Sequence, residues 1–139
     1  MTERTLIVIK PDGVRRGLVG KILSRFEDRG FKIVGLKMQT LTKEEAEEFY
    51  SPHVNKPFFS DLISFITSGP IVAAIIEGPS AIEVVRRMIG PTNPKEAPSG
   101  TIRGDFGLGL TENVVHASDS FESYLKEASI IFEDLFNDK

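Results

Sequence analysis

The chain has 139 residues, of which 40% are hydrophobic and 27% are charged, which is the ordinary composition of a globular domain with its own core. The absence of cysteine excludes disulfides, thiolate metal sites and thiol catalysis. A formal net charge of −3 argues against nonspecific binding of nucleic acid, which usually requires a basic face. We find neither a signal peptide nor an apolar run near the roughly 20 residues of a membrane span. We therefore expect a cytoplasmic protein with no membrane partner and no specific nucleic-acid partner.

The first part of the chain predicts a strand and a helix. Residues 5–9 form an apolar run that is typical of a strand covered on both faces. Residues 10–13 end this strand with the proline and glycine of a turn. Apolar residues then recur at helical spacing over 18–26, and Gly30 is placed to end that helix.

A second strand and two further helices follow. Residues 31–41 predict the strand, in which a change of apolar parity indicates a β-bulge near Gly35. A capping box that starts at Thr42 opens a short helix running toward Tyr50. The next helix lies between residues 55 and 70, bounded by prolines and a glycine. The two helices together predict a helical hairpin.

The third strand is predicted over residues 71–76, which are apolar throughout. Ser80 and Glu83 then have the spacing that caps a helix, and this helix ends at Gly90. The segment from 90 to 113 follows as a long loop with no predicted regular structure. Connections beyond about 12–15 residues are usually functional or disordered, and the prolines of this one favour an ordered binding loop.

Val114 and Val115 predict a short last strand before a terminal helix. The N-cap of that helix is Asp119, in a capping box with Glu122, or alternatively Ser120. The alternation of strands and helices excludes an all-β barrel and a helical bundle. It predicts an α+β fold, the ferredoxin-like split βαβ sandwich, in which a four-stranded antiparallel sheet is covered by helices and the helical hairpin is inserted between strands two and three. A small doubly wound sheet is the alternative, because continuous apolar strands also fit parallel pairing.

Several side chains of this chain suit the binding of phosphate. On an acidic protein a phosphate ligand requires a local cluster of cations, and the candidates are Lys10, Arg86 and Arg103. Thr92 and Arg103 offer a hydroxyl and a planar guanidinium fork within the long loop. A solvated loop with a surface arginine is the equal alternative. For Arg86, which lies off the apolar stripe of its helix, exposure to solvent is the default.

His116 is the candidate nucleophile, because it lies between a strand end and a helix start. Its unperturbed pKa of about 6.5 makes a neutral imidazole available at pH 7. Ser118 can offer a hydroxyl to an anion near the helix start. Glu127 lies two helical turns beyond Ser120 on the same helical face, where its carboxylate can reach the His116 ring and fix the tautomer of the imidazole. The alternative for His116 is a histidine that only forms a hydrogen bond at a strand end. His53 lies between two helices, where we expect it to pack or to form a hydrogen bond.

Familiar cofactor motifs are absent. Gly20-Lys21 lacks the hydroxyl residue that completes a P-loop, and Gly107-Leu-Gly109 lacks the third glycine of a dinucleotide fingerprint. No dense set of His, Asp and Glu has metal-ligand spacing, so no metal site built from protein side chains is expected. Of Phe58 and Phe59, only one can face the core, which leaves the other as a candidate platform for a flat ligand.

Five segments of the chain resemble the nucleoside diphosphate kinase family. They are Ile-Lys-Pro-Asp-Gly-Val (9–14), Arg-Gly-Leu-Val-Gly (16–20), Thr-Asn-Pro (92–94), Gly-Thr-Ile-Arg-Gly-Asp-Phe (100–106) and Asn-Val-Val-His-Ala-Ser-Asp-Ser (113–120). They span nearly the whole chain in the family's order, so we interpret residues 1–139 as a single domain of this kind. The resemblance implies a ping-pong reaction through a phosphohistidine. In it the γ-phosphate of a nucleoside triphosphate, such as ATP or GTP, is transferred to a nucleoside diphosphate with broad base tolerance.

The resemblance also implies roles for individual residues. His116 takes the position of the nucleophile, Glu127 that of the carboxylate holding its ring, and Ser118 that of the serine supporting the glutamate. The phosphate- and ribose-binding positions are occupied by polar and cationic side chains: Lys10, Tyr50, Arg86, Thr92, Arg103 and Asn113. Lys10 is also counted with the catalytic residues, and His53 with the supporting ones. The base-stacking position is that of Phe58, with Leu110 opposite and Leu62 near, and Mg²⁺ is expected to arrive with the nucleotide.

The chain departs from the family pattern at three positions, Thr111, Glu112 and Ala117. Ala117 is a small change unless that residue requires a positive φ. The resemblance further implies a homo-oligomer, a hexamer or alternatively a tetramer. Two rival functions differ from it: a member that binds nucleotides without catalysis, and a ferredoxin-like RNA-binding module. The second would require exposed aromatic side chains on the strands and a basic surface.

Overall fold

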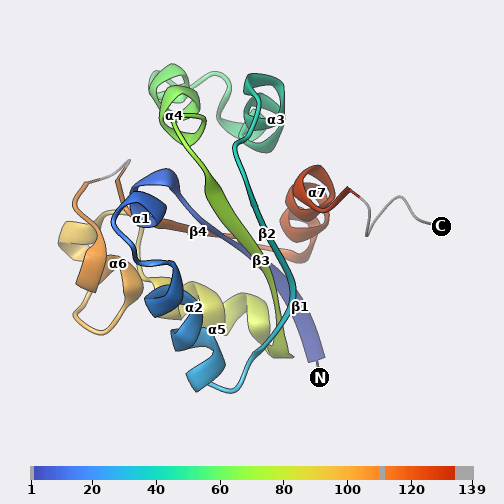
Figure 1. Cartoon of the computed structure of the whole chain (residues 1–139), viewed down its shortest axis with the longest axis vertical. Coiled ribbons are helices and arrows are strands. Elements are labelled where there is room, and N and C mark those ends of the chain that lie inside the picture. Colours follow the sequence, from blue (N-terminus) through green and yellow to red (C-terminus); the bar gives the residue numbers. More distant parts are fainter. Residues whose placement is uncertain (1, 110–111, 134–139) are drawn as a thin grey trace.

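The structure, a computed structural model, describes residues 2–109 and 112–133. Its centre is a four-stranded sheet with the strand order β2-β3-β1-β4 (Figure 1). The strands are β1 (Thr2–Ile9), β2 (Lys32–Gln39), β3 (Ile71–Pro79) and β4 (Val115–Ala117). Every neighbouring pair is antiparallel. The ferredoxin-like fold is therefore confirmed, and the doubly wound alternative is wrong.

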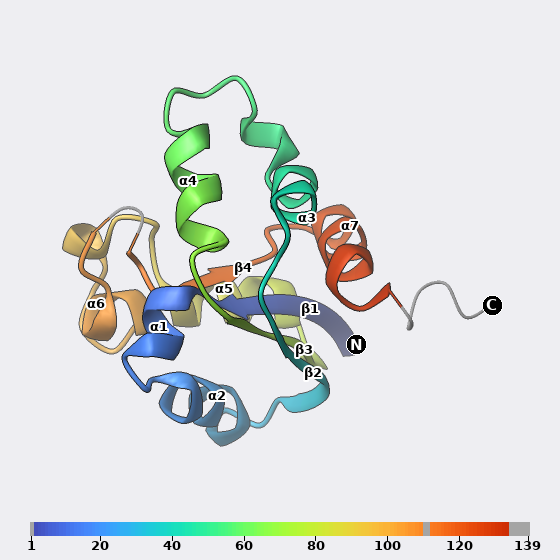
Figure 2. The same cartoon turned by 45° about the horizontal axis from the view of Figure 1, so that its top comes forward.

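Helices cover both faces of this sheet. They are α1 (Pro11–Arg15), α2 (Val19–Asp28), α3 (Lys43–Phe49), η1 (Ser51–His53), α4 (Phe59–Ile66), α5 (Ala81–Ile89), η2 (Pro94–Glu96), α6 (Ile102–Phe106) and α7 (Phe121–Ile131). Figure 2 shows α2 on one side of the sheet and the predicted hairpin of α3 and α4 on the other. None of the helices in the described ranges is long and apolar enough to cross a membrane.

The apolar strands explain this two-sided cover, because successive side chains of a strand point to opposite faces. Ile7 and Ile9 of β1 belong to the core that α2 and α5 close. Leu6 and Val8 belong to the core beneath α3, α4 and α7. Within the described residues no aromatic side chain is exposed on a strand, so the arrangement that the RNA-binding alternative requires is not found there.

Two local predictions are confirmed. The register between β2 and β3 shifts between Ile33 and Gly35, which is the expected bulge. The Thr42 capping box is complete, because the Thr42 Oγ1 accepts the Glu45 N–H at 3.1 Å and the Glu45 carboxylate accepts the Thr42 N–H at 2.9 Å. Both features depend on neighbouring residues, which is why the sequence reveals them.

Other local predictions are wrong. Ser80 stands at the N-cap of α5 with a left-handed φ of 51° and makes no capping bond. The carboxylate of Glu3, from β1, accepts the Ile82 N–H instead, at 3.2 Å. At α7 the Asp119 capping box is wrong and the alternative, Ser120, is the N-cap, since Ser120 Oγ accepts the Ser123 N–H at 3.0 Å.

Two predicted irregular segments contain helical turns. Residues 10–13, expected as a turn, lead directly into α1, with proline at its first position. The loop after Gly90 contains η2 and α6. A short helix of five residues has too few apolar positions to show a period, so the sequence pattern does not reveal it.

The pairing of β4 with β1 decides where the functional candidates meet. His116 of β4 lies opposite Val8, and Val115 lies opposite Ile9, the last residue of β1. The start of α1, the segment before β4 and the long loop after α5 therefore converge at one end of β1. Figure 1 shows α1, α6 and β4 gathered there.

Candidate active site

His116, Glu127 and Ser118 form a hydrogen-bonded group. The His116 Nε2 lies 2.9 Å from Glu127 Oε1, and the Ser118 Oγ donates to the same oxygen at 2.7 Å. The side chains of His116 and Glu127 are 21% and 13% exposed, so the ring is partly open to a ligand while its carboxylate partner is more shielded. When Nε2–H donates to the carboxylate, the lone pair of a neutral imidazole is on Nδ1. The helical spacing of Glu127 predicted this contact.

Lys10 lies directly beyond β1, and its side chain is buried. The Lys10 Nζ donates to Asn113 Oδ1 at 2.8 Å, and Asn113 Nδ2 donates to the Thr92 carbonyl at 3.0 Å. Burial and, to a smaller extent, the positive charge of Arg103 lower the pKa of Lys10 to about 8, against the opposing effect of the Asp12 carboxylate. Keeping the buried ammonium charged therefore costs free energy, and an anion bound beside it would recover part of that cost.

The loop that carries Arg103 is held from behind by α2. Thr101 caps α6, because its Oγ1 accepts the Gly104 N–H at 3.0 Å. Arg25 of α2 pairs with Asp105 at 2.7 Å and donates to the Gly100 carbonyl at 3.1 Å. These contacts hold α6 against the body of the protein, so the arginine within it has a defined position.

Arg103 is almost fully buried, at 4% exposure. It donates through Nη1 to the Gly90 carbonyl at 2.9 Å and through Nη2 to the Val115 carbonyl at 2.8 Å. Burial and, to a smaller extent, the positive charge of the nearby Arg86 lower its pKa to about 10. Within the described residues, no ion pair with a carboxylate involves Lys10 or Arg103. Two buried cations are thus opposed, among the described carboxylates, only by the more distant Asp12, and they leave a positive potential that a phosphate group would balance.

Arg86 and the aromatic residues complete the wall around His116. Arg86 is exposed, and its Nη1 donates to the Ala117 carbonyl at 3.2 Å. The ring centroids of Phe49 and Tyr50 lie 5.2 and 6.2 Å from that of His116, both in edge arrangements. Burial raises the pKa of Tyr50, and Glu127 raises it further, so the phenol stays neutral. Phe49 is a neighbour that the sequence analysis missed, because it belongs to no motif and reads as core.

The outer rim carries a second aromatic group. Phe58 is 48% exposed, whereas Phe59 and Leu62 pack against the core, so Phe58 is the available platform. The His53 ring lies 5.8 Å from it, centroid to centroid, and the Lys56 ammonium lies 5.9 Å above it. Burial lowers the pKa of His53, and Lys56 lowers it further.

The structure brings together most of the side chains that the sequence assigned to the site, but two positions need comment. The Thr92 side chain is exposed, and the structure links this residue to Asn113 through its backbone carbonyl. Leu110, assigned opposite Phe58, lies outside the described residues. No group of three or more His, Cys, Asp or Glu side chains that could hold a metal ion occurs in the part of the chain that is described.

The backbone just before His116 is strained. Val114 has a φ of +66°, a conformation that costs a β-branched residue about 1–3 kcal/mol. The Val115 N–H donates to the Asn113 carbonyl at 2.8 Å, and the Val114 N–H donates to Asp12 Oδ2 at 3.2 Å. The sequence analysis missed Asp12, which it treated only as part of a turn.

Comparison with known proteins agrees with this geometry. A family model described as nucleoside diphosphate kinase matches residues 3–135. A nucleoside diphosphate kinase of Staphylothermus marinus is 66% identical over 133 residues, which cover 96% of this chain and 94% of the relative. The crystal structure of the Aquifex aeolicus nucleoside diphosphate kinase has a TM-score of 0.94 at 48% identity, covering 97% of this chain and 98% of that one. The chain belongs to the nucleoside diphosphate kinase family.

As a nucleoside diphosphate kinase family member, the chain is an enzyme of nucleotide metabolism, a kinase of the transferase class. A second similar structure, from Halobacterium salinarum, was solved in complex with CDP. It has a TM-score of 0.93 at 45% identity and covers 96% of this chain and 90% of that one. The family resemblance found in the sequence is therefore confirmed.

The departures from the nucleoside diphosphate kinase pattern cause little disturbance where the structure describes them. Ala117 is not among the residues with a positive φ, so an alanine is unstrained at this position. The Glu112 side chain is exposed, and the Glu112 carbonyl accepts the Leu108 N–H at 2.9 Å. Thr111 lies outside the described residues.

Proposed function

We propose that the chain transfers the γ-phosphate of a nucleoside triphosphate to a nucleoside diphosphate in two steps, through a phosphohistidine on His116. The observation that carries this proposal is the pairing of His116 Nε2 with Glu127, beside two buried cations that form no ion pair with a carboxylate among the described residues. In the first step the Nδ1 lone pair attacks the γ-phosphorus and the bond to the bridging oxygen breaks, so the nucleoside diphosphate leaves. In the second step an oxygen of another nucleoside diphosphate attacks the phosphohistidine and the P–N bond breaks.

The surrounding side chains have electrostatic and positioning roles in this reaction. The phosphorylated ring carries positive charge, which the Glu127 carboxylate balances through Nε2. Lys10, Arg86 and Arg103 neutralise the charge of the moving phosphoryl group, which is most of what phosphoryl transfer requires. Lys10, Tyr50, Thr92 and Asn113 are proposed to bind the phosphates and the ribose, with Ser118 and His53 in supporting positions.

Mg²⁺ is the proposed cofactor, bound through the nucleotide. Within the described residues no three His, Cys, Asp or Glu side chains gather as a cage for a hard cation, and the Glu127 carboxylate already contacts His116 and Ser118. We therefore assign the ion to the phosphate oxygens of the nucleotide, where it would supply charge neutralisation. No protein side chain is proposed as a metal ligand.

Phe58 is the proposed platform for the base, with Leu62 near and Leu110 opposite. Its half-exposed ring offers a face for stacking, which every nucleobase can provide. Stacking without hydrogen bonds to the base edge distinguishes poorly between bases. Broad nucleoside tolerance, including ATP and GTP, follows from this kind of contact.

The larger context is also part of the proposal. We treat residues 1–139 as one nucleoside diphosphate kinase domain that acts in the cytoplasm as a homo-oligomer, a hexamer or alternatively a tetramer. The edge strand β2 supports an assembly of identical chains, because Leu36 and Met38 on it are 57% and 60% exposed. Replacing both with glutamate should reduce the mass measured by light scattering, whereas an unchanged mass would exclude β2 from the interface.

The test is phosphorylation of the protein itself. Incubation with Mg²⁺ and γ-labelled ATP should give an acid-labile, base-stable phosphoprotein whose label maps to His116. His116→Ala should abolish the label while nucleotide binding persists. Label that persists on His53 in this variant would refute the assignment. Nucleotide binding without label or turnover in the unmodified protein would instead support a binding module that lacks catalysis.

A further inference from the structure

A hydrogen-bonded unit joins α1 to the backbone that precedes His116. The Val115 N–H donates to the Asn113 carbonyl at 2.8 Å, and Val114, with its φ of +66°, lies at the centre of the resulting γ-turn. Both backbone polar groups of Val114 are bonded to the segment after β1. The Val114 carbonyl accepts the Lys10 N–H at 2.8 Å, and its N–H donates to Asp12 Oδ2 at 3.2 Å.

Asp12 is an unusual residue for the place that it occupies. It is 7% exposed, within a helix of five residues, and its Oδ1 has no hydrogen-bond partner among the described residues. Burial raises its pKa, although the Lys10 ammonium and backbone amides oppose the shift. A turn alone does not require a buried carboxylate, which costs free energy. Apart from the Lys10 charge and the amides of its own helix, the Val114 N–H is the group that this carboxylate meets.

Gly13 shows how closely α1 approaches the γ-turn. A Cβ atom at this position would lie 3.2 Å from the Val114 carbonyl oxygen and 2.8 Å from Ile9 Cγ2. The backbone of α1 is thus packed directly on the turn, and the Asp12 carboxylate lies within reach of the one N–H that the turn directs at it. Strain of this kind persists only where surrounding groups hold it.

The γ-turn lies among the groups that the proposed reaction needs. Its first residue, Asn113, accepts from Lys10 Nζ, and its last residue, Val115, accepts from Arg103 Nη2. His116 follows immediately. A change in the backbone angles of Val114 would move Asn113 relative to His116, and with it the two buried cations.

We propose that Asp12 is a positioning residue for phosphoryl transfer: by accepting the Val114 N–H it holds the γ-turn that places Asn113 and His116 relative to Lys10 and Arg103. The inference rests on the proposed function, since the groups it places are those of the phosphohistidine reaction. Asp12 acts through Val114 and touches neither substrate.

The first test compares three variants by the rate of labelling at His116 at saturating ATP, per folded molecule. Asp12→Ala removes the acceptor, and we expect the rate to fall by about 10-fold to 100-fold, the cost of a misplaced reacting group. Asp12→Asn keeps an acceptor oxygen and removes the charge, so the rate should stay within about threefold, because the hydrogen bond survives. Asp28→Ala, an exposed aspartate at the end of α2, is the matched control and should leave the rate unchanged.

The second test follows the Val114 amide itself by hydrogen exchange. Exchange should be slow in the unmodified protein and in Asp12→Asn, and fast in Asp12→Ala. If the unmodified protein is not labelled at His116, the proposed function fails. Separately, if the Val114 amide exchanges as slowly in Asp12→Ala as in the unmodified protein, Asp12 does not hold the γ-turn. If the protein is labelled and Asp12→Ala is labelled as fast, the positioning role alone is overturned. Should Asp12→Ala not fold, Asp12→Asn decides, because a fall above about tenfold would show that the charge and not the hydrogen bond matters.

Discussion

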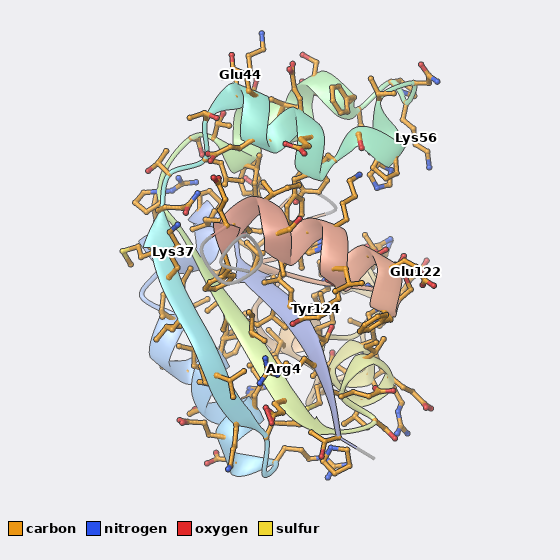
Figure 3. All side chains as sticks on the ribbon, turned by 90° about the vertical axis from the view of Figure 1, so that its right-hand side faces the viewer. Arg4, Lys37, Glu44, Lys56, Glu122 and Tyr124 are labelled. Atoms are coloured by element: carbon orange, nitrogen blue, oxygen red, sulfur yellow. The ribbon has the colours of Figure 1, made fainter. Side chains whose placement is uncertain are left out.

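The two ends of β1 each carry a basic side chain, and the structure surrounds them in opposite ways. Arg4, near the start, has a side chain that is 54% exposed and lies 3.3 Å from Glu77 on the neighbouring strand. Figure 3 shows this end, with Arg4 on the sheet beside α7 and Tyr124. Lys10, directly after the other end, is buried and donates to an amide oxygen. Arg4 forms an ion pair with a carboxylate of the protein, whereas Lys10 forms none among the described residues.

The Arg4 end of β1 also lies beside a groove in the protein surface. Arg4, Glu77, Phe121 and Tyr124 contribute to the lining of a groove there. Arg4 and Glu77 in this groove neutralise one another, and the Glu3 carboxylate that also lines it accepts the Ile82 N–H. An exposed pair such as Arg4 and Glu77 contributes little to stability. At the other end, the pKa values of Lys10 and Arg103 are both lowered, because nearby negative charge does not offset the desolvation of these two cations. An uncompensated charge is therefore a better sign of a phosphate site than a concave surface.

Removing the charge at each end should have the largest effect and should separate the two regions. Lys10→Met should lower kcat/KM by about 10²–10³-fold, since one preorganised charged contact at a transition state is worth about 2.7–4 kcal/mol. The free energy of unfolding should change far less than the activity, because removal of a desolvated charge offsets the lost bond to Asn113 and the lost attraction to Asp12. Arg4→Met is the matched control and should change stability by less than about 0.5 kcal/mol and leave turnover unchanged. Equal losses of turnover in the two variants, measured in a coupled assay, would break the comparison.

The carboxylate behind His116 should give the next largest effect. Glu127→Gln keeps an acceptor for the ring but removes the charge that balances the phosphorylated imidazole. Hydrogen bonds to charged groups are worth about 1.5–3 kcal/mol, so the labelling rate should fall by about 10-fold to 150-fold. Ser118→Ala removes one donor to the same carboxylate and should cost less.

Glu122 offers a matched control for this substitution. It lies in the first turn of the same helix and is exposed, as Figure 3 shows. Glu122→Gln should leave the labelling rate unchanged. A similar fall in both variants would mean that the rate responds to the general charge of α7 rather than to contact with the ring.

The pH dependence should show the Lys10 end directly. The pKa of Lys10 is lowered to about 8, with Arg103 and Asp12 as the charged groups that face it. Above this pH the ammonium loses its proton, so kcat/KM should fall by up to about tenfold per pH unit. The unfolded chain keeps an ordinary lysine pKa and binds more protons, so the stability of the ligand-free protein should rise between about pH 8 and 10.5. A basic limb that starts only near the ordinary lysine pKa would contradict the burial of this charge.

The sequence predictions that rest on interactions between neighbouring residues are confirmed, whereas one that a contact with a remote residue overrides is wrong. The Thr42 capping box and the Gly35 bulge depend on adjacent residues, and both are present. Ser80 was predicted to cap its helix, but Glu3 supplies the acceptor from a strand remote in sequence. Propensity at a helix start was overridden there by a tertiary contact.

The same reasoning separates the parts of the candidate site. Glu127 was predicted from helical spacing, because it lies only 11 residues from His116. The bond between Lys10 and Asn113 spans 103 residues, and that between Asp12 and Val114 spans 102. Spacing holds no information on such contacts, so Lys10 and Asn113 were assigned by family resemblance, whereas Asp12 was missed.

The aromatic residues at the two ends should give the smallest effect and the finest test of the comparison. Phe58 and Phe121 are 48% and 54% exposed, so they match in type and exposure. Stacking of a base on an aromatic ring is worth about 1–3 kcal/mol, and a half-exposed ring should contribute near the lower limit. Phe58→Ala should therefore raise KM about fivefold for adenine and guanine nucleotides alike and leave kcat nearly unchanged, because the contact is the same in the ground state and the transition state. Phe121→Ala should leave both constants unchanged, and a rise in KM there would place the nucleotide at the Arg4 end instead.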